Sequence, residues 1–316
     1  MIPAVKIKNL AVEKAELTVL KAFTYFDIFN YPLAEQEIKN FLGHSINEEE
    51  FRSAMRQLLF AKTIFKFNEF YSLQNKPEMA EKRLQGNARA KRFLPKAAKI
   101  GAFLYKFPYV RAVAVSGSLS KNYADPKADI DFFIITKTNR LWIARTFLHL
   151  FKKCTFLIGR QHFYCMNYFI DERALLIRDQ NIYTATEVVT LLPVGGADMI
   201  NHFFKINSWT ANWLPVYEAK HELNISDKGS FLKKIVEKIF DKKAGDRFDD
   251  FLFRLTTRRW QRKEKSGRRN LKGKLMNLVT DKHFSKSDPE AFQEKIVAMY
   301  ENKIDQLKDC RPQYFD

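Results

Sequence analysis

The sequence predicts a mixed α/β protein, of the α+β kind, in which helical units flank a central mixed sheet. Apolar residues recur at helical spacing from residue 16 onward, which predicts a helical N-terminal unit. Short apolar runs rich in β-branched residues at 109–115 and 129–135 predict buried strands, and 139–153 has the pattern of a covering helix. A chain of 316 residues suggests two or three domains. We place them at 1–80, 81–197 and 198–316, and expect the last to be largely helical and basic.

Composition limits the class of protein. Apolar residues make up 46% of the chain, which excludes a disordered protein. No apolar run approaches the roughly 18 residues that cross a bilayer, so we expect no membrane-spanning segment. The N-terminal residues lack the apolar stretch of a signal peptide, and the three cysteines are too widely spaced for a disulfide framework or a metal cluster. We therefore expect a reduced, cytoplasmic protein with no membrane partner.

The net charge of +18 is unevenly distributed along the chain. Residues 81–110 hold 8 basic residues against 1 acidic residue, and residues 251–274 hold 10 against the single Glu264. Such a block attracts a polyanion through counterion release, although solvated helix faces also carry such charge. Charge therefore suggests a class of partner without identifying one.

Three helices followed by a hairpin are expected in the N-terminal unit. Apolar spacing predicts helices at 17–28 and 33–42. Asn47 is a good N-cap for a third helix, and the three glutamates that follow it suit the positive end of the helix dipole. Two short alternating runs around Asn68-Glu69 predict a hairpin. This order of elements resembles a winged helix-turn-helix.

The winged-helix resemblance implies DNA binding through the third helix, but the charge disfavours it. Residues 1–80 hold 10 basic and 10 acidic residues, which leaves little attraction for a phosphate backbone. We therefore expect this unit to serve packing or protein contact.

A basic helical connector is expected at residues 78–106. Pro95 should bend or interrupt this helix, because proline removes a backbone donor and clashes with the preceding turn. The basic side chains of the connector, Arg83 among them, would form a solvated face or border a nucleotide or nucleic-acid groove.

The most informative stretch joins the two predicted strands. The first strand runs directly into Ser116-Gly117-Ser118, and the second carries Asp129 and Asp131 at positions i and i+2, which lie on one face of a strand. Two adjacent carboxylates repel unless a cation lies between them, and Mg²⁺ commonly takes one or two carboxylates together with substrate phosphates. Glycine allows backbone N–H groups to approach a phosphate closely. The pattern therefore favours a site for metal-bound triphosphate.

The string GSLSKNYADPKADIDFFII resembles the signature of the DNA polymerase β-like nucleotidyltransferase superfamily. The family has Gly-Ser, ten residues and then Asp-x-Asp, and this spacing separates Gly117-Ser118 from Asp129 and Asp131 here. The resemblance implies that the two aspartates hold two Mg²⁺ ions. It also implies that Gly117, Ser118 and Lys121 bind the triphosphate of a nucleoside triphosphate. Asn122 stands where the family has a second glycine, which makes the turn less standard.

Active members of that family usually carry a third carboxylate on a later strand. The corresponding strand here is expected at 163–170, where Asn167 is the polar residue in the middle and Asp171 lies at the exit. We expect Asp171 to complete the catalytic set with Asp129 and Asp131. Asn167 as a carbonyl ligand and Glu187 as a more distant carboxylate are the alternatives.

The sequence thus predicts an enzyme that moves a nucleoside monophosphate from a nucleoside triphosphate to a hydroxyl group. The acceptor could be RNA, a protein or a small molecule, and the charge of +18 favours a polyanion such as RNA. The alternative is a catalytically degenerate member of the fold that binds nucleic acid or regulates a partner, using the basic block at 251–274.

Overall fold

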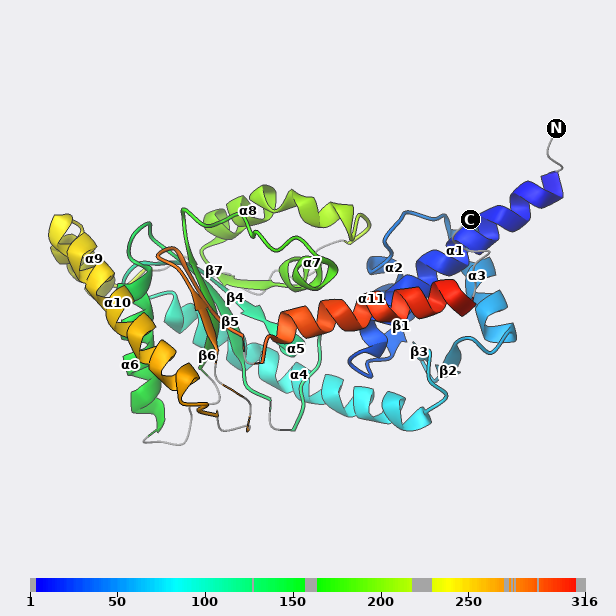
Figure 1. The fold of residues 1–316 in the computed structure, drawn as a ribbon, viewed down its shortest axis with the longest axis horizontal. Coiled ribbons are helices and arrows are strands. Elements are labelled where there is room, and N and C mark those ends of the chain that lie inside the picture. Colours follow the sequence, from blue (N-terminus) through cyan, green and yellow to red (C-terminus); the bar gives the residue numbers. More distant parts are fainter. Residues whose placement is uncertain are drawn as a thin grey trace.

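The computed structural model shows a mixed α/β protein with a six-stranded mixed sheet and a smaller three-stranded antiparallel sheet, which confirms the expected fold class. It describes residues 4–126, 128–156, 164–217, 229–269, 273, 275, 277–288 and 290–310. The molecule is elongated, with the N-terminal helices at one end, the large sheet towards the other, and long helices running between them (Figure 1).

The N-terminal unit contains the expected helices and hairpin. In chain order it consists of α1 (Ala4–Asp27), β1 (Leu33–Ala34), α2 (Glu35–Asn40), α3 (Glu48–Phe60), β2 (Phe65–Phe67) and β3 (Phe70–Ser72). Asn47 caps α3 as expected, because its side chain accepts a hydrogen bond of 2.9 Å from the Glu50 N–H. The helix expected at 33–42 is shorter, since its first two residues pair with β3 instead.

Helix α4 (Pro77–Leu104) forms the connector and continues through Pro95, so the expected interruption does not occur. Its basic residues are not all solvated. Arg83 is 2% exposed, and its guanidinium donates to Glu37 at 2.6 Å and to the Pro32 carbonyl at 2.9 Å. Arg83 therefore joins α4 to the N-terminal unit, which is a structural role that the charge count did not indicate.

The large sheet has the order β7-β4-β5-β6-β9-β8. Its strands are β4 (Val110–Ser116), β5 (Asp131–Thr136), β6 (Cys165–Asp171), β7 (Leu192–Gly195), β8 (Leu278–Thr280) and β9 (Phe284–Ser287). The helices between β4 and β7 are α5 (Gly117–Ser120), α6 (Leu141–Phe156) and α7 (Ile182–Val189). Strands β5 and β6 run parallel, and the other described pairs are antiparallel. The parallel pair is joined through α6, as such a crossover requires. The strand expected at 163–170 begins at Cys165, and residue 163 lies outside the described residues.

The remaining elements are α8 (Ala197–Ile206), the 3₁₀ turn η2 (Ser208–Asn212), α9 (Phe231–Phe240), α10 (Lys243–Lys265) and α11 (Phe292–Cys310). The third region is thus largely helical, but it also supplies two strands to the large sheet. Strand β9 pairs with β6, and α11 returns to the N-terminal unit, where Lys303 contacts Asp27 at 2.7 Å (Figure 1). None of the described helices is long and apolar enough to cross a membrane.

Both faces of the sheet are covered by apolar side chains. On β4, Val113 and Val115 belong to one core cluster and Ala112 and Ala114 to another, as the two-residue period of a strand requires. The first cluster includes residues of α4 and α6, and the second includes residues of α7 and α8. Burial on both faces explains why β4 and β5 read as nearly continuous apolar runs.

Candidate active site

The two aspartates lie where β4 ends and β5 begins. Asp131 is the first residue of β5 and pairs with Ser116, the last residue of β4, whereas Asp129 precedes the strand that was expected to contain it. Both aspartates are half-buried, and the intervening Ile130 is fully buried. The alternation expected from the sequence therefore holds, with the apolar residue in the core and the carboxylates at its edge.

Gly117 brings the backbone against the Asp131 carboxylate. Its φ is +69°, a left-handed conformation that costs a residue with a side chain about 1–2 kcal/mol. A Cβ at this position would lie 2.7 Å from Oδ2 of Asp131, well inside van der Waals contact. Glycine is therefore required here for two independent reasons, its backbone conformation and the space that the carboxylate occupies. Ser118 follows at the start of α5 and is exposed.

Lys121 lies on the turn after α5 and already has an acidic partner. Its ammonium group donates to Glu187 Oε1 at 2.8 Å and to the Gly117 carbonyl at 3.1 Å. The Tyr31 hydroxyl donates to the Lys121 carbonyl at 2.6 Å, so the N-terminal unit holds the same turn. An anion that binds the Lys121 ammonium group would have to displace the carboxylate of Glu187, a residue of α7.

Asn167 of β6 contacts Asp131 directly. Its Nδ2 donates to Oδ1 of Asp131 at 2.5 Å, and its Oδ1 accepts from the Cys165 thiol at 3.0 Å. An amide, which cannot accept a proton as a carboxylate does, therefore stands beside Asp131.

Asp171 does not reach the aspartate pair, which corrects the expectation that it completes the catalytic set. In the parallel register Asp131 pairs with Cys165, whereas Asp171 pairs with Thr136 at the opposite end of β5. Asp171 is fully buried there, and its carboxylate accepts from the Asn139 N–H at 3.0 Å and contacts Nδ1 of His283 at 2.8 Å. Strand β6 runs away from the site, so Asp171 at its C-terminal end lies far from Cys165 at its N-terminal end.

Two further side chains near the site were not anticipated. Burial, reinforced by the charges of Asp131 and Asp129, raises the pKa of the Cys165 thiol to about 12, which makes it a poor nucleophile at neutral pH. Burial is the main cause that raises the pKa of the Tyr183 hydroxyl, and the negative charges of Glu187 and Asp131 raise it further. Tyr183 and Glu187 are four residues apart on α7, and this spacing in the sequence predicts that their side chains are neighbours on one face of a helix.

The donor set fits one magnesium ion better than two. Among the described residues no group of three His, Cys, Asp or Glu side chains is placed to hold a metal. Asp129 and Asp131 provide the one or two carboxylates that Mg²⁺ takes when phosphates complete its shell. The expected second, acceptor-side ion finds no third carboxylate among the described residues, because Asn167 stands beside Asp131 and Glu187 is paired with Lys121.

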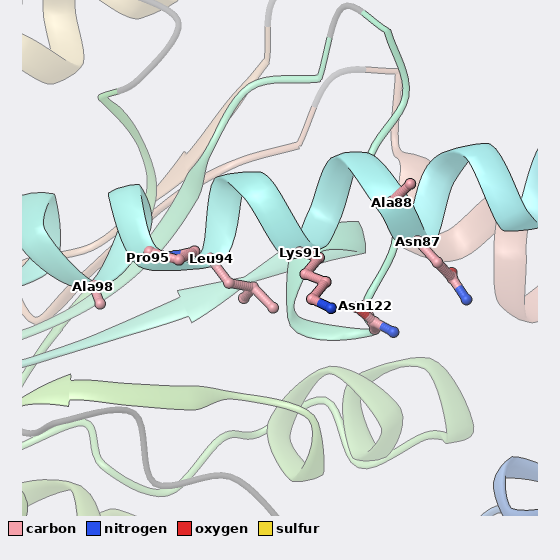
Figure 2. A pocket seen from close by; sticks show the side chains of 7 residues that line it. All are labelled: Asn87, Ala88, Lys91, Leu94, Pro95, Ala98 and Asn122. Carbon is pink, nitrogen blue, oxygen red and sulfur yellow. The ribbon is translucent and has the colours of Figure 1, made fainter.

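A cavity of about 490 Å³ opens between α4 and the turn that carries Asn122 (Figure 2). Its lining consists of Asn87, Ala88, Lys91, Leu94, Pro95 and Ala98 of α4, together with Asn122. Asn122 has a φ of +56°, a left-handed conformation that asparagine tolerates, so this turn forms without a glycine at that position. The cavity is of the size that takes small ligands, and its lining includes the basic side chain of Lys91.

No family model, no curated protein and no solved structure matches this chain. Its function must therefore be inferred from the residues and geometry of the site.

Proposed function

We propose that this protein is a Mg²⁺-dependent nucleotidyltransferase that moves a nucleoside monophosphate from a nucleoside triphosphate to a hydroxyl group. The observation that carries the proposal is the approach of Gly117 to the Asp131 carboxylate, with Asp129 two residues away. This arrangement supports the proposal because carboxylates are ligands that Mg²⁺ prefers, and a glycine backbone allows a phosphate to approach closely. The Gly-Ser and Asp-x-Asp spacing of the nucleotidyltransferase signature supports the same assignment.

In this proposal Asp129 and Asp131 hold the metal, and Gly117 and Ser118 bind the outer phosphates. Bound Mg²⁺ would supply charge neutralisation on the triphosphate. The acceptor oxygen attacks the α-phosphorus and its proton passes to solvent water, the bond from that phosphorus to the β-phosphate bridging oxygen breaks, and pyrophosphate leaves. Lys121 would exchange Glu187 for a phosphate oxygen, a charge-assisted contact of the kind that lysine commonly makes.

The geometry also predicts a slow enzyme. Removing the acceptor proton requires a base, and the amide of Asn167 next to Asp131 cannot supply one. A missing general base typically costs about 10²–10⁴ in rate. We therefore expect turnover well below that of a nucleotidyltransferase with three carboxylates.

Labelled nucleoside triphosphates with Mg²⁺ or Mn²⁺ and pools of RNA, protein and small-molecule acceptors test the proposal. We expect acceptor-dependent pyrophosphate release that disappears in the double variant Asp129→Ala with Asp131→Ala. The matched control removes two exposed acids from α11, in the double variant Glu301→Ala with Asp309→Ala, and should keep full activity. Equal turnover in the wild type and the aspartate variant would contradict the proposal.

A second candidate function is nucleic-acid binding by a catalytically degenerate version of the same fold. The C-terminal half of α10 crowds positive charges together. Burial is the main cause that lowers the pKa of Lys263, and the nearby positive charges of Arg259, Arg268 and Lys153 lower it further. Arg259 and Arg262 are exposed, so the cluster is accessible to a phosphate backbone. Salt-sensitive RNA binding that is lost when Arg258, Arg259, Arg262 and Lys263 are changed to glutamine, without nucleotide turnover, would favour this function.

We also propose that the N-terminal unit is a winged helix that serves packing instead of DNA recognition. Three glutamates occupy the first turn of α3, where they would repel a phosphate backbone. The core of the unit includes Ile182 and Ala185 of α7 and Ile296 of α11, so it is built jointly with the rest of the chain. A DNA-binding assay with the Glu48→Lys, Glu49→Lys variant as comparison tests this: the wild type should not bind.

A further inference from the structure

Helix α9 packs on the body of the protein largely through polar side chains, together with Phe240. Lys233 is buried, and its Nζ donates to the carbonyls of Val110 at 2.6 Å and Tyr105 at 3.0 Å. One turn later, the Glu237 carboxylate accepts from the Tyr109 N–H at 2.7 Å and from Arg111 at 2.9 Å. A surface helix normally turns its apolar side inward, whereas of the described apolar residues of α9 only Val236 and Phe240 are half-buried and the others are exposed.

Phe231, Ile235 and Ile239 of α9 are consequently exposed, and exposed apolar residues continue onto α10. On α9, Phe231 is 77% and Ile239 is 62% exposed, and on α10 Phe251 is 56% and Leu255 is 53% exposed. Stacked rings join the two helices, since Phe240 lies 5.6 Å from Phe248, which lies 6.5 Å from Phe251. We call Phe231, Ile235, Ile239, Phe248, Phe251 and Leu255 the apolar strip. A contiguous strip of this kind on a soluble protein marks a binding surface.

The charges of the two helices are segregated. The acidic residues are mostly paired with basic residues of the body: Glu237 with Arg111, Asp241 with Lys137, Asp246 with Arg140 and Asp250 with Lys282. The exposed basic residues around the apolar strip are Lys234, Lys238, Lys242, Lys243, Arg247, Arg254 and Arg258. The face that α9 and α10 present is therefore apolar and positively charged.

We propose that the apolar strip and its surrounding basic residues bind the surface of an anionic lipid bilayer. An amphipathic helix that combines exposed phenylalanine and leucine with lysine and arginine lies in the interface of such a bilayer, with its apolar side among the acyl chains. The basic side chains are attracted by the negative surface potential of anionic lipids. This proposal departs from the expectation of no membrane partner, which rested on the absence of a spanning segment, because peripheral binding requires no helix that crosses the membrane.

The observations favour lipid over the two other partners that such a face could have. A second copy of this chain would bring two positively charged rims together, which charge repulsion opposes. RNA would neutralise the charges and stack bases on the exposed phenylalanine rings, but it would leave the aliphatic side chains of Ile235, Ile239 and Leu255 against water. The position of α9 and α10 at the end of the molecule opposite the N-terminus leaves their outer side open to a large flat surface (Figure 1).

Co-sedimentation with vesicles tests the proposal, using phosphatidylcholine alone and phosphatidylcholine mixed with phosphatidylserine. We expect binding to the mixed vesicles only. The variant Lys234→Gln, Lys238→Gln, Arg254→Gln should bind roughly a hundredfold more weakly, since each basic residue near the surface contributes about fivefold in affinity. The variant Phe231→Gln, Ile239→Gln, Phe251→Gln should lose at least about tenfold through the apolar contribution.

The matched control changes three exposed apolar residues elsewhere, in the variant Phe60→Gln, Leu176→Gln, Met299→Gln. It should bind vesicles as the wild type does. Absence of binding to either vesicle would overturn the proposal. A dimer that dissociates in the variant Phe231→Gln, Ile239→Gln, Phe251→Gln would also overturn it. So would RNA binding that depends on the apolar strip in a protein that does not bind vesicles. Nucleotidyl transfer is measured separately and without lipid, so failure of this proposal is distinguishable from failure of the proposed activity.

Discussion

Replacing Gly117 by alanine tests the geometry on which the proposed activity depends. The new Cβ would lie 2.7 Å from Asp131 Oδ2, and ordinary van der Waals contact begins at 3.4 Å. The carboxylate must therefore move by about 0.7 Å, and displacements of this size at a reacting centre cost up to about a hundredfold in rate. The left-handed φ of +69° adds about 1–2 kcal/mol to the cost of folding.

Gly267→Ala provides the matched control, because it separates the two costs. Gly267 also has a left-handed φ, +61°, but nothing lies within 4 Å of the position that its Cβ would take. Both variants should therefore lose about 1–2 kcal/mol of stability in urea unfolding, since both place alanine in the left-handed region. Only Gly117→Ala carries the additional contact with the Asp131 carboxylate.

Mn²⁺ binding, followed by electron paramagnetic resonance with and without nucleoside triphosphate, measures the consequence at the site. We expect Gly117→Ala to bind Mn²⁺ at least about tenfold more weakly than Gly267→Ala, with turnover reduced by one to two orders of magnitude. Equal Mn²⁺ affinity in the two variants would refute the inference that Gly117 leaves room for a metal-binding carboxylate.

Three other substitutions give distinct outcomes. Asn167→Asp places a carboxylate beside Asp131, so Mn²⁺ affinity and turnover should rise, and a fall in both would show that the amide is itself required. Asp171→Asn should leave turnover unchanged but lower stability by about 1–3 kcal/mol in urea unfolding, because it weakens a buried contact to His283. Burial raises the pKa of Asp249 from 3.8 to about 7. The folded protein therefore holds the proton more tightly than the unfolded chain, and stability should fall as pH rises from about 4 to about 7, by on the order of 2–4 kcal/mol. Asp249→Asn should remove this fall in pH-dependent urea unfolding, and a persistent slope would assign it to another group.

The sequence alone was enough to find the centre of the candidate site. The placement of Asp129 and Asp131 around a buried Ile130 follows from the two-residue alternation of an extended chain, which is a local property. The cap at Asn47 and the hairpin at Asn68-Glu69 are local as well, and both are confirmed. Local patterns hold because the residues involved are within a few positions of each other in the chain.

The tertiary structure decided which residues surround that centre. Strands β5 and β6 are parallel and joined by a long crossover, and nothing in the crossover sets their register, so only the packed sheet shows that Asn167 meets Asp131 and that Asp171 does not. Glu187 reaches Lys121 because α7 packs across the chain, 66 residues away from the turn. The pairing of β9 with β6 is equally nonlocal. Such contacts depend on how apolar faces fit together over the whole molecule, and a linear pattern of residue types does not carry that information.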